Sequence, residues 1–79
     1  MGLIESKRAQ RLLEVVLANR KNCRFEDLAG LLEAVGFTAR NGKGSHVVFK
    51  RGSSIITVPR RKPVKEIYVE HALALIDAD

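Results

Sequence analysis

Residues 46–59 read HVVFKRGSSIITVP, and this stretch decides the fold. Residues 46–50 and 54–58 are rich in β-branched residues and phenylalanine, a composition typical of β-strands. The intervening residues 51–53 predict a tight turn, and Pro59 ends the second strand because proline cannot donate to a β-ladder. The stretch therefore predicts an antiparallel hairpin.

A third strand is expected immediately before this hairpin. Residues 37–40 have the composition of a short strand. Residues 41–44 then predict a turn, because Gly42 and Gly44 can both adopt positive φ. Two close turns in succession indicate an antiparallel meander of three strands.

Helical periodicity predicts three helices around the meander. Apolar residues recur at helical spacing over 6–19 and 25–35, and Gly36 follows the second run where a left-handed cap is expected. Pro63 is expected to open the last helix, because its missing N–H does no harm there. The expected buried stripe of that helix is Val64, Ile67 or Tyr68, Ala72, Leu75 and Ile76. The order α-α-β-β-β-α predicts an α+β fold with the helices packed on one face of the sheet.

Size and composition exclude several classes of protein. The chain has 79 residues, which is enough for a single domain over 1–79 but leaves little room for an enclosed cofactor pocket. Its only cysteine, Cys23, cannot form an internal disulfide or a thiolate zinc site. No run approaches the ~18 apolar residues of a membrane helix, and the first residues lack the apolar core of a signal peptide. We therefore expect a cytoplasmic protein that does not enter a membrane.

Positive charge is concentrated in the sheet and in the start of the last helix. The formal net charge is +5, but no acidic residue occurs between Glu33 and Glu66, whereas eight lysines and arginines do. The rest of the chain is net acidic. A one-sided basic surface of this kind is typical of a polyanion-binding protein. A solubilising sheet face is the simpler interpretation of the same pattern.

The segment Gly42-Lys43-Gly44-Ser45-His46 is the one candidate for chemistry. A glycine turn lets a phosphate approach the backbone closely, and a lysine can hold that phosphate as a point charge. Imidazole titrates near neutral pH, so His46 could transfer a proton during phosphodiester cleavage. Strand alternation predicts that His46 points outward with Val48 and Lys50, and that Val47 and Phe49 point inward.

A histidine at the start of a strand is more often an ordinary surface residue than a catalytic one, and the second histidine does not supply a clear partner. His71 lies beside the expected buried stripe of the last helix, so a structural role is expected for it. From the residues alone, His46 therefore remains a hypothesis for a single catalytic group.

From about Phe25 onward the chain resembles the HicA family of toxin ribonucleases. The resemblance rests on pieces in the right order: the helix start at 25–28, the helix end at 31–37, Gly-Ser-His before the strand at 47–49, Thr-Val-Pro at 57–59, and the last helix from Pro63. It implies a core over 25–77 with a fold similar to a double-stranded RNA-binding domain. The helix at 6–19 is then an addition, whose role as core, dimer contact or partner contact stays open.

The resemblance also implies an activity, namely metal-independent cleavage of mRNA without any cofactor, restrained by a HicB-type antitoxin. His46 would be the catalytic residue, with Ser45 and the backbone near Gly44 positioning it. Phosphate contacts are then expected from Lys43, Lys50, Arg60, Arg61 and Lys62. Many family members carry a histidine after the Val-Pro of the third strand, where this chain has Arg60-Arg61. Arginine can bind phosphate there but cannot serve as an ordinary proton donor at neutral pH.

Two other functions fit the same sequence. A non-catalytic double-stranded RNA-binding module would use the same basic residues to contact phosphates and 2′-OH groups. An interaction module would dock an acidic protein on the same surface. The oligomeric state, as a homodimer or as a toxin–antitoxin hetero-oligomer, stays open as well.

Overall fold

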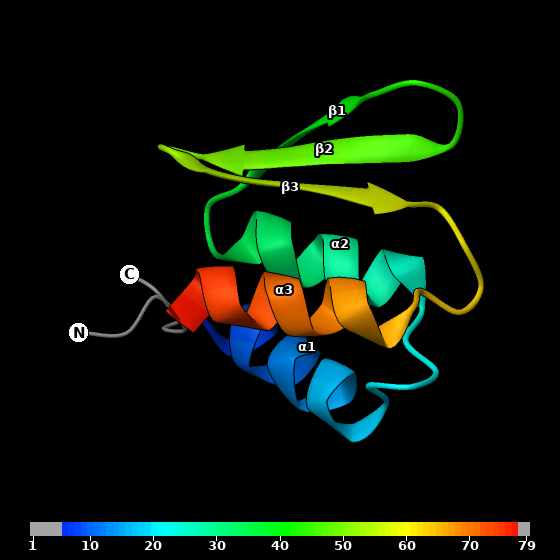
Figure 1. The fold of residues 1–79 in the computed structure, drawn as a ribbon. Coiled ribbons are helices and arrows are strands. Elements are labelled where there is room, and N and C mark those ends of the chain that lie inside the picture. Colours follow the sequence, from blue (N-terminus) through cyan, green and yellow to red (C-terminus); the bar gives the residue numbers. More distant parts are fainter. Residues whose placement is uncertain (1–5, 78–79) are drawn as a thin grey trace.

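A three-stranded antiparallel sheet in the order β1-β2-β3 forms one layer of the computed structural model, which describes residues 6–77 (Figure 1). The strands are β1 (Thr38–Asn41), β2 (His46–Arg51) and β3 (Ser54–Pro59). Phe49 in the central strand lies opposite Ala39 of β1 and Ile56 of β3. The predicted meander is therefore confirmed.

The helices are α1 (Lys7–Ala18), α2 (Phe25–Ala34) and α3 (Glu66–Asp77). α2 and α3 cover one face of the sheet, and α1 lies beyond them on the same side (Figure 1). The order α-α-β-β-β-α and the α+β class agree with the sequence prediction. The opposite face of the sheet carries no helix in the described part of the chain.

Alternation along β2 divides buried from exposed side chains. Val47 and Phe49 are buried against the helices, and Ile56 and Val58 of β3 join them in the core. His46 and Lys50 are exposed. The predicted outward direction of His46 and Lys50 is thus confirmed, because neighbouring residues of a strand point to opposite faces.

α1 is an integral layer of the protein. The Ser6 hydroxyl accepts a hydrogen bond from the Ala9 N–H at 2.9 Å and so caps the helix. Ala9 and Val16 are fully buried. A Cβ added to Gly30 of α2 would lie 3.2 Å from Cδ1 of Leu12, so α1 packs closely over this glycine. Both predicted ends of α1 are correct to within one residue.

The last helix starts later than the sequence predicted. α3 begins at Glu66 and not at Pro63, which follows a cis peptide bond. Val64 forms an isolated antiparallel bridge with Cys23, and its N–H donates to the Cys23 carbonyl oxygen at 2.9 Å. A residue in such a bridge is extended, so the chain cannot turn into a helix before it has passed Val64.

The buried stripe of α3 also differs in part from the prediction. Ala72 and Ile76 are buried as expected, but Val69 completes the stripe at helical spacing. Ile67 is 71% exposed, and Tyr68 and Leu75 are only partly buried. His71, for which a structural role beside this stripe is expected, is exposed and is not part of the core.

The first turn of the meander differs in detail. β1 is displaced by one residue and ends at Asn41, while Phe37 is buried just before it. Gly44 adopts φ +59°, as a turn glycine can, but Gly42 is not among the glycines with positive φ. Gly36 does adopt φ +103° after α2, as expected for a left-handed cap.

Arg51 joins the sheet to the ends of two helices. Its guanidinium donates to the carbonyl oxygens of Val35 at 2.8 Å and Leu75 at 3.4 Å. The guanidinium carbon also lies 4.5 Å from the centre of the Phe37 ring. These contacts satisfy carbonyl groups at the C-terminal ends of α2 and α3, which have no partner within their own helices.

No helix within residues 6–77 is long and apolar enough to cross a membrane.

Candidate active site and basic surface

The β1–β2 turn holds His46 through one carbonyl group. The Lys43 carbonyl oxygen accepts the backbone N–H of His46 at 3.1 Å and lies 3.1 Å from Nδ1 of the same residue. A carbonyl oxygen can only accept, so Nδ1 carries the proton in this hydrogen bond. The backbone and the ring of His46 are therefore both fixed by the preceding turn.

This hydrogen bond determines which ring nitrogen is available. When Nδ1 is the donor, the neutral imidazole carries its lone pair on Nε2. His46 is an exposed residue on the face of the sheet opposite the helices. Its Nε2 can therefore accept a proton from a ligand that lies on this open face.

Gly42 contacts His46 through its backbone. The Gly42 N–H donates to the His46 carbonyl oxygen at 2.9 Å. A Cβ added at Gly42 would lie 3.4 Å from that oxygen and 3.7 Å from Cβ of His46. Both distances are ordinary van der Waals contacts, so the space beside His46 does not require glycine, and Gly42 does not adopt the positive φ expected of a turn glycine.

Arg60 lies at the same end of the sheet as His46 and contacts residues at the two ends of the β1–β2 turn. Its backbone N–H donates to the Ser45 carbonyl oxygen at 2.8 Å, and its Nη2 donates to Oδ1 of Asn41 at 3.0 Å. The guanidinium carbon also lies 5.4 Å from the centre of the Phe25 ring at the start of α2. The structure therefore brings Ser45, His46 and Arg60 together at one end of the sheet.

The guanidinium of Arg60 and the ring of His46 do not share a face of the sheet. Asn41 lies opposite Val47, whose side chain is buried on the helix side. Paired residues in an antiparallel ladder point to the same face, so Asn41 and the guanidinium that it binds lie on that side. His46 and Arg60 therefore flank the sheet end from its two faces.

Lys50 does not belong to this cluster. It lies four residues along β2 from His46, which corresponds to about 13 Å in an extended strand. It shares the open face with Arg40, whose strand position is opposite Val48. The sequence analysis did not single out Arg40, because its face follows only from the register between β1 and β2.

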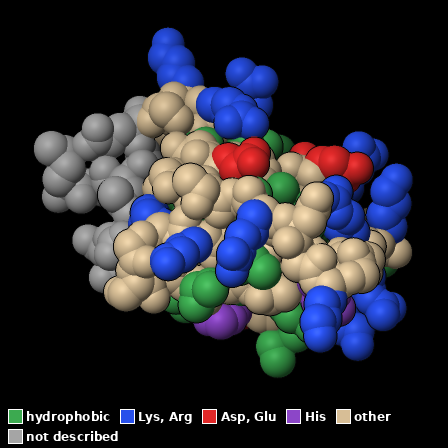
Figure 2. All heavy atoms as spheres, turned by 90° about the horizontal axis from the view of Figure 1, so that it is seen from above, with side chains coloured by type: hydrophobic (Ala, Val, Ile, Leu, Met, Phe, Trp, Pro, Cys, Tyr) green, Lys and Arg blue, Asp and Glu red, His purple; other side chains and the backbone are tan. Residues whose placement is uncertain are grey.

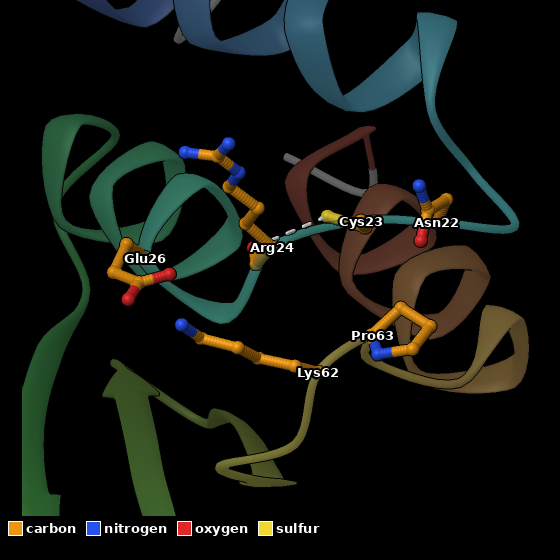
Figure 3. A pocket seen from close by; sticks show the side chains of 6 residues that line it. All are labelled: Asn22, Cys23, Arg24, Glu26, Lys62 and Pro63. Carbon is orange, nitrogen blue, oxygen red and sulfur yellow. Dashed lines mark hydrogen bonds between the residues drawn. The ribbon is translucent and has the colours of Figure 1, made fainter.

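The remaining predicted residues lie on the flank of the sheet. Arg61 and Lys62 are exposed in the loop between β3 and α3. Lys62 lines a hollow of about 430 Å³, and its side chain extends toward Glu26 at the start of α2 (Figure 3). Arg61 lines a neighbouring hollow of about 570 Å³.

The basic residues give the sheet side of the molecule a positive surface. Figure 2 looks onto this side, where lysine and arginine side chains are widespread and acidic side chains are visible only in the upper half of the view. Of the basic residues between Glu33 and Glu66, Arg51 is half-buried and serves the fold. The others are exposed, namely Arg40, Lys43, Lys50, Arg60, Arg61, Lys62 and Lys65.

Comparison with known proteins assigns most of this chain to a family. Residues 25–77 match the family model described as the HicA toxin of bacterial toxin-antitoxin systems. The match covers more than half of the chain and includes the whole sheet, α2 and α3, whereas α1 precedes it. No curated protein and no solved structure gives a significant match.

Proposed function

Because this chain belongs to the HicA toxin family, it is the toxin of a toxin–antitoxin system, and we propose that it is an endoribonuclease that cleaves mRNA with His46 as its catalytic residue. Lys43, Lys50 and the arginines after β3 contact the phosphates of the RNA. A HicB-type antitoxin holds the toxin inactive by covering this basic surface.

The observation that supports this proposal best is the hydrogen bond between Nδ1 of His46 and the Lys43 carbonyl oxygen. It assigns the proton to Nδ1 and leaves the lone pair of the neutral ring on Nε2, and His46 is an exposed residue. A catalytic base needs a lone pair that faces the substrate and a ring whose orientation is fixed. A surface histidine without a catalytic role needs neither the free lone pair nor the fixed orientation.

The proposed reaction uses the 2′-OH group of the RNA as the nucleophile. Nε2 of His46 accepts the proton of a 2′-OH group, whose oxygen forms a bond to the adjacent phosphorus. The bond from this phosphorus to the 5′-oxygen breaks, and the leaving oxygen takes a proton from a water molecule. The hydroxide so formed takes back the proton that Nε2 of His46 accepted. The Lys43 side chain, which belongs to the same turn as His46, offsets the negative charge that develops on the phosphate. The step needs no metal ion and no cofactor.

The test is cleavage of mRNA by the purified protein and by two histidine variants. His46→Ala removes the proposed base, and His71→Ala makes the same chemical change at an exposed position on α3. General acid–base catalysis contributes about 100- to 10,000-fold, so His46→Ala should lose activity by that factor. His71→Ala should cleave like the unchanged protein.

Two outcomes would overturn the assignment. Equal activity in the protein and its His46→Ala variant would exclude His46 as the base. Tight, salt-sensitive RNA binding without any cleavage would favour a non-catalytic RNA-binding module. Growth arrest on expression, with loss of mRNA in the same cells, is the corresponding result in vivo.

A further inference from the structure

Two adjoining hollows lie between the loop that follows α1 and the loop that joins β3 to α3. Their volumes are about 430 and 570 Å³. Both are lined by Lys62 and Pro63, so they adjoin each other, and we call the two together the flank groove. Figure 3 shows the first of them.

Backbone pairing joins the two loops that line the flank groove. The backbone bridge between Cys23 and Val64 joins the two loops, and both residues are almost completely buried. The Cys23 thiol donates to the Arg24 carbonyl oxygen at 3.4 Å beside the hollow (Figure 3). The side chains on the rim therefore project from two loops that are held at a constant separation.

Basic residues outnumber acidic residues in the lining. The acidic ones are Glu26 and Glu66. The basic ones, all exposed, are Lys21, Arg24, Arg61, Lys62 and Lys65. Lys21 and Arg24 precede the stretch that matches the family model, so the loop after α1 contributes part of this charge. A groove with this lining favours an anionic ligand.

The groove begins near the end of the sheet that carries His46. The Arg60 N–H is bonded to the Ser45 carbonyl oxygen, immediately before His46. Lys62 follows Arg60 by two residues, so their Cα atoms are at most about 7 Å apart. An RNA strand held at His46 on the open face therefore reaches the flank groove by passing around the end of the sheet at Arg60.

We propose that the flank groove binds the backbone phosphates of the RNA strand that His46 cleaves, several nucleotides away from the cleaved bond. This inference rests on the proposed function. It adds a second phosphate subsite, built partly by the loop after α1, and it makes productive binding depend on RNA length.

The lining favours RNA over an acidic protein as the occupant. Protein interfaces are usually anchored by large apolar or aromatic side chains in their centre. Among the described residues, the exposed large apolar side chains are Leu17, Ile55 and Ile67, and none of them lines the flank groove. Phosphates need only the charges that the groove offers.

The test measures RNA binding in the full-length His46→Ala protein, so that cleavage does not interfere. Two single-stranded oligonucleotides of about 4 and 16 nucleotides bracket the usual site sizes of single-strand-binding grooves. The groove variant is Lys21→Gln with Lys65→Gln. The control removes two positive charges from the first half of α1, by Lys7→Gln with Arg11→Gln.

The groove variant should bind the long RNA more weakly, whereas its affinity for the short RNA should change much less. The slope of log affinity against log salt should fall by about 0.7 for each phosphate contact that is lost. The control should keep the long-to-short affinity ratio. Glu26→Gln should act in the opposite direction and strengthen binding of the long RNA, because it removes a carboxylate from the lining.

Equal long-to-short ratios in the groove variant and the control would overturn the proposal. So would unchanged RNA binding together with lost binding of the antitoxin, because the groove would then belong to the protein partner. Binding in the His46→Ala protein does not depend on catalysis. A protein that shows the length effect but never cleaves would therefore support the groove and refute the proposed function.

Discussion

The carbonyl oxygen of Lys43 accepts two hydrogen bonds from a single residue, the backbone N–H and the ring Nδ1–H of His46, both at 3.1 Å. The first closes the turn and the second fixes the ring. The orientation of the proposed catalytic group is thus set by the turn that precedes it.

This arrangement predicts the effect of replacing His46 with asparagine. His46→Asn keeps an amide N–H near the position of Nδ1, so the hydrogen bond to Lys43 can persist, but it has no counterpart of Nε2. We expect Asn to preserve the midpoint of urea unfolding and to lower cleavage by about 100-fold or more. A purely structural histidine would instead be rescued by Asn, and its cleavage rate would recover.

Two glycines provide a matched test of the turn geometry. Gly44 and Gly52 both adopt φ +59°, and a Cβ at either position would meet no atom within 4 Å. Alanine at each should therefore cost a similar amount, about 1–2 kcal/mol, in the free energy of unfolding. Only Gly44 lies in the turn that holds His46, so Gly44→Ala should lower cleavage more than Gly52→Ala does. Urea unfolding and cleavage assays on both variants check this, and equal cleavage by the two would argue against control by the turn.

Arg51 should matter for stability. Arg51→Met keeps much of the side-chain length but loses the hydrogen bonds to Val35 and Leu75 and the contact with Phe37. The partners left without a donor should lower the free energy of unfolding by about 1–3 kcal/mol. Arg40→Met, on the exposed face of β1, is the control and should change stability little. Equal unfolding midpoints for the two variants would contradict the role assigned to Arg51.

Cys23 predicts a loss of stability in alkaline solution. Burial, with help from the Asp27 carboxylate, raises the pKa of the Cys23 thiol above its ordinary value of 9.0. In the folded protein the thiol therefore keeps its proton at pH values where the unfolded chain has lost it. As the pH rises above 9.0, the unfolded chain loses this proton more readily than the folded protein does, so the free energy of unfolding falls.

The measurement is urea unfolding of the protein and of Cys23→Ala over the range from neutral to alkaline pH. Cys23→Ala lowers stability at every pH because it removes buried atoms, so the slopes with pH are compared and not the absolute values. The variant should lose less stability per pH unit above pH 9.0 than the unchanged protein. Parallel curves would show that the thiol does not contribute to the alkaline loss.

The sequence predicted what depends on local pattern and missed what depends on distant partners. The strands, the helices and the outward direction of His46 follow from periodicity and turn residues, which act over a few positions. The start of α3 was wrong because Val64 pairs with Cys23, far away along the chain. Proline at the first position of a helix is a good local rule, and here a bridge between distant segments overrides it.

The same limit applies to the candidate site. The run from Lys43 to His46 is local, so the sequence alone could group it as one candidate site, whose catalytic role stays a prediction. The bond from Arg60 to Asn41 and the position of Arg40 opposite Val48 depend on strand register, which the sequence analysis did not assign. Arg51 was counted with the surface charges because nothing in its own neighbourhood shows that two helix ends lie within its reach.

The bridge between Cys23 and Val64 has a consequence for synthesis. The ribosome delivers the chain from its N-terminus, so Cys23 leaves the exit tunnel long before Val64 does. A nascent chain can form α1 and α2, but it cannot join its two loops until the segment after β3 has emerged. The complete flank groove, to which we propose that RNA binds, therefore forms only after the segment that follows β3 has emerged.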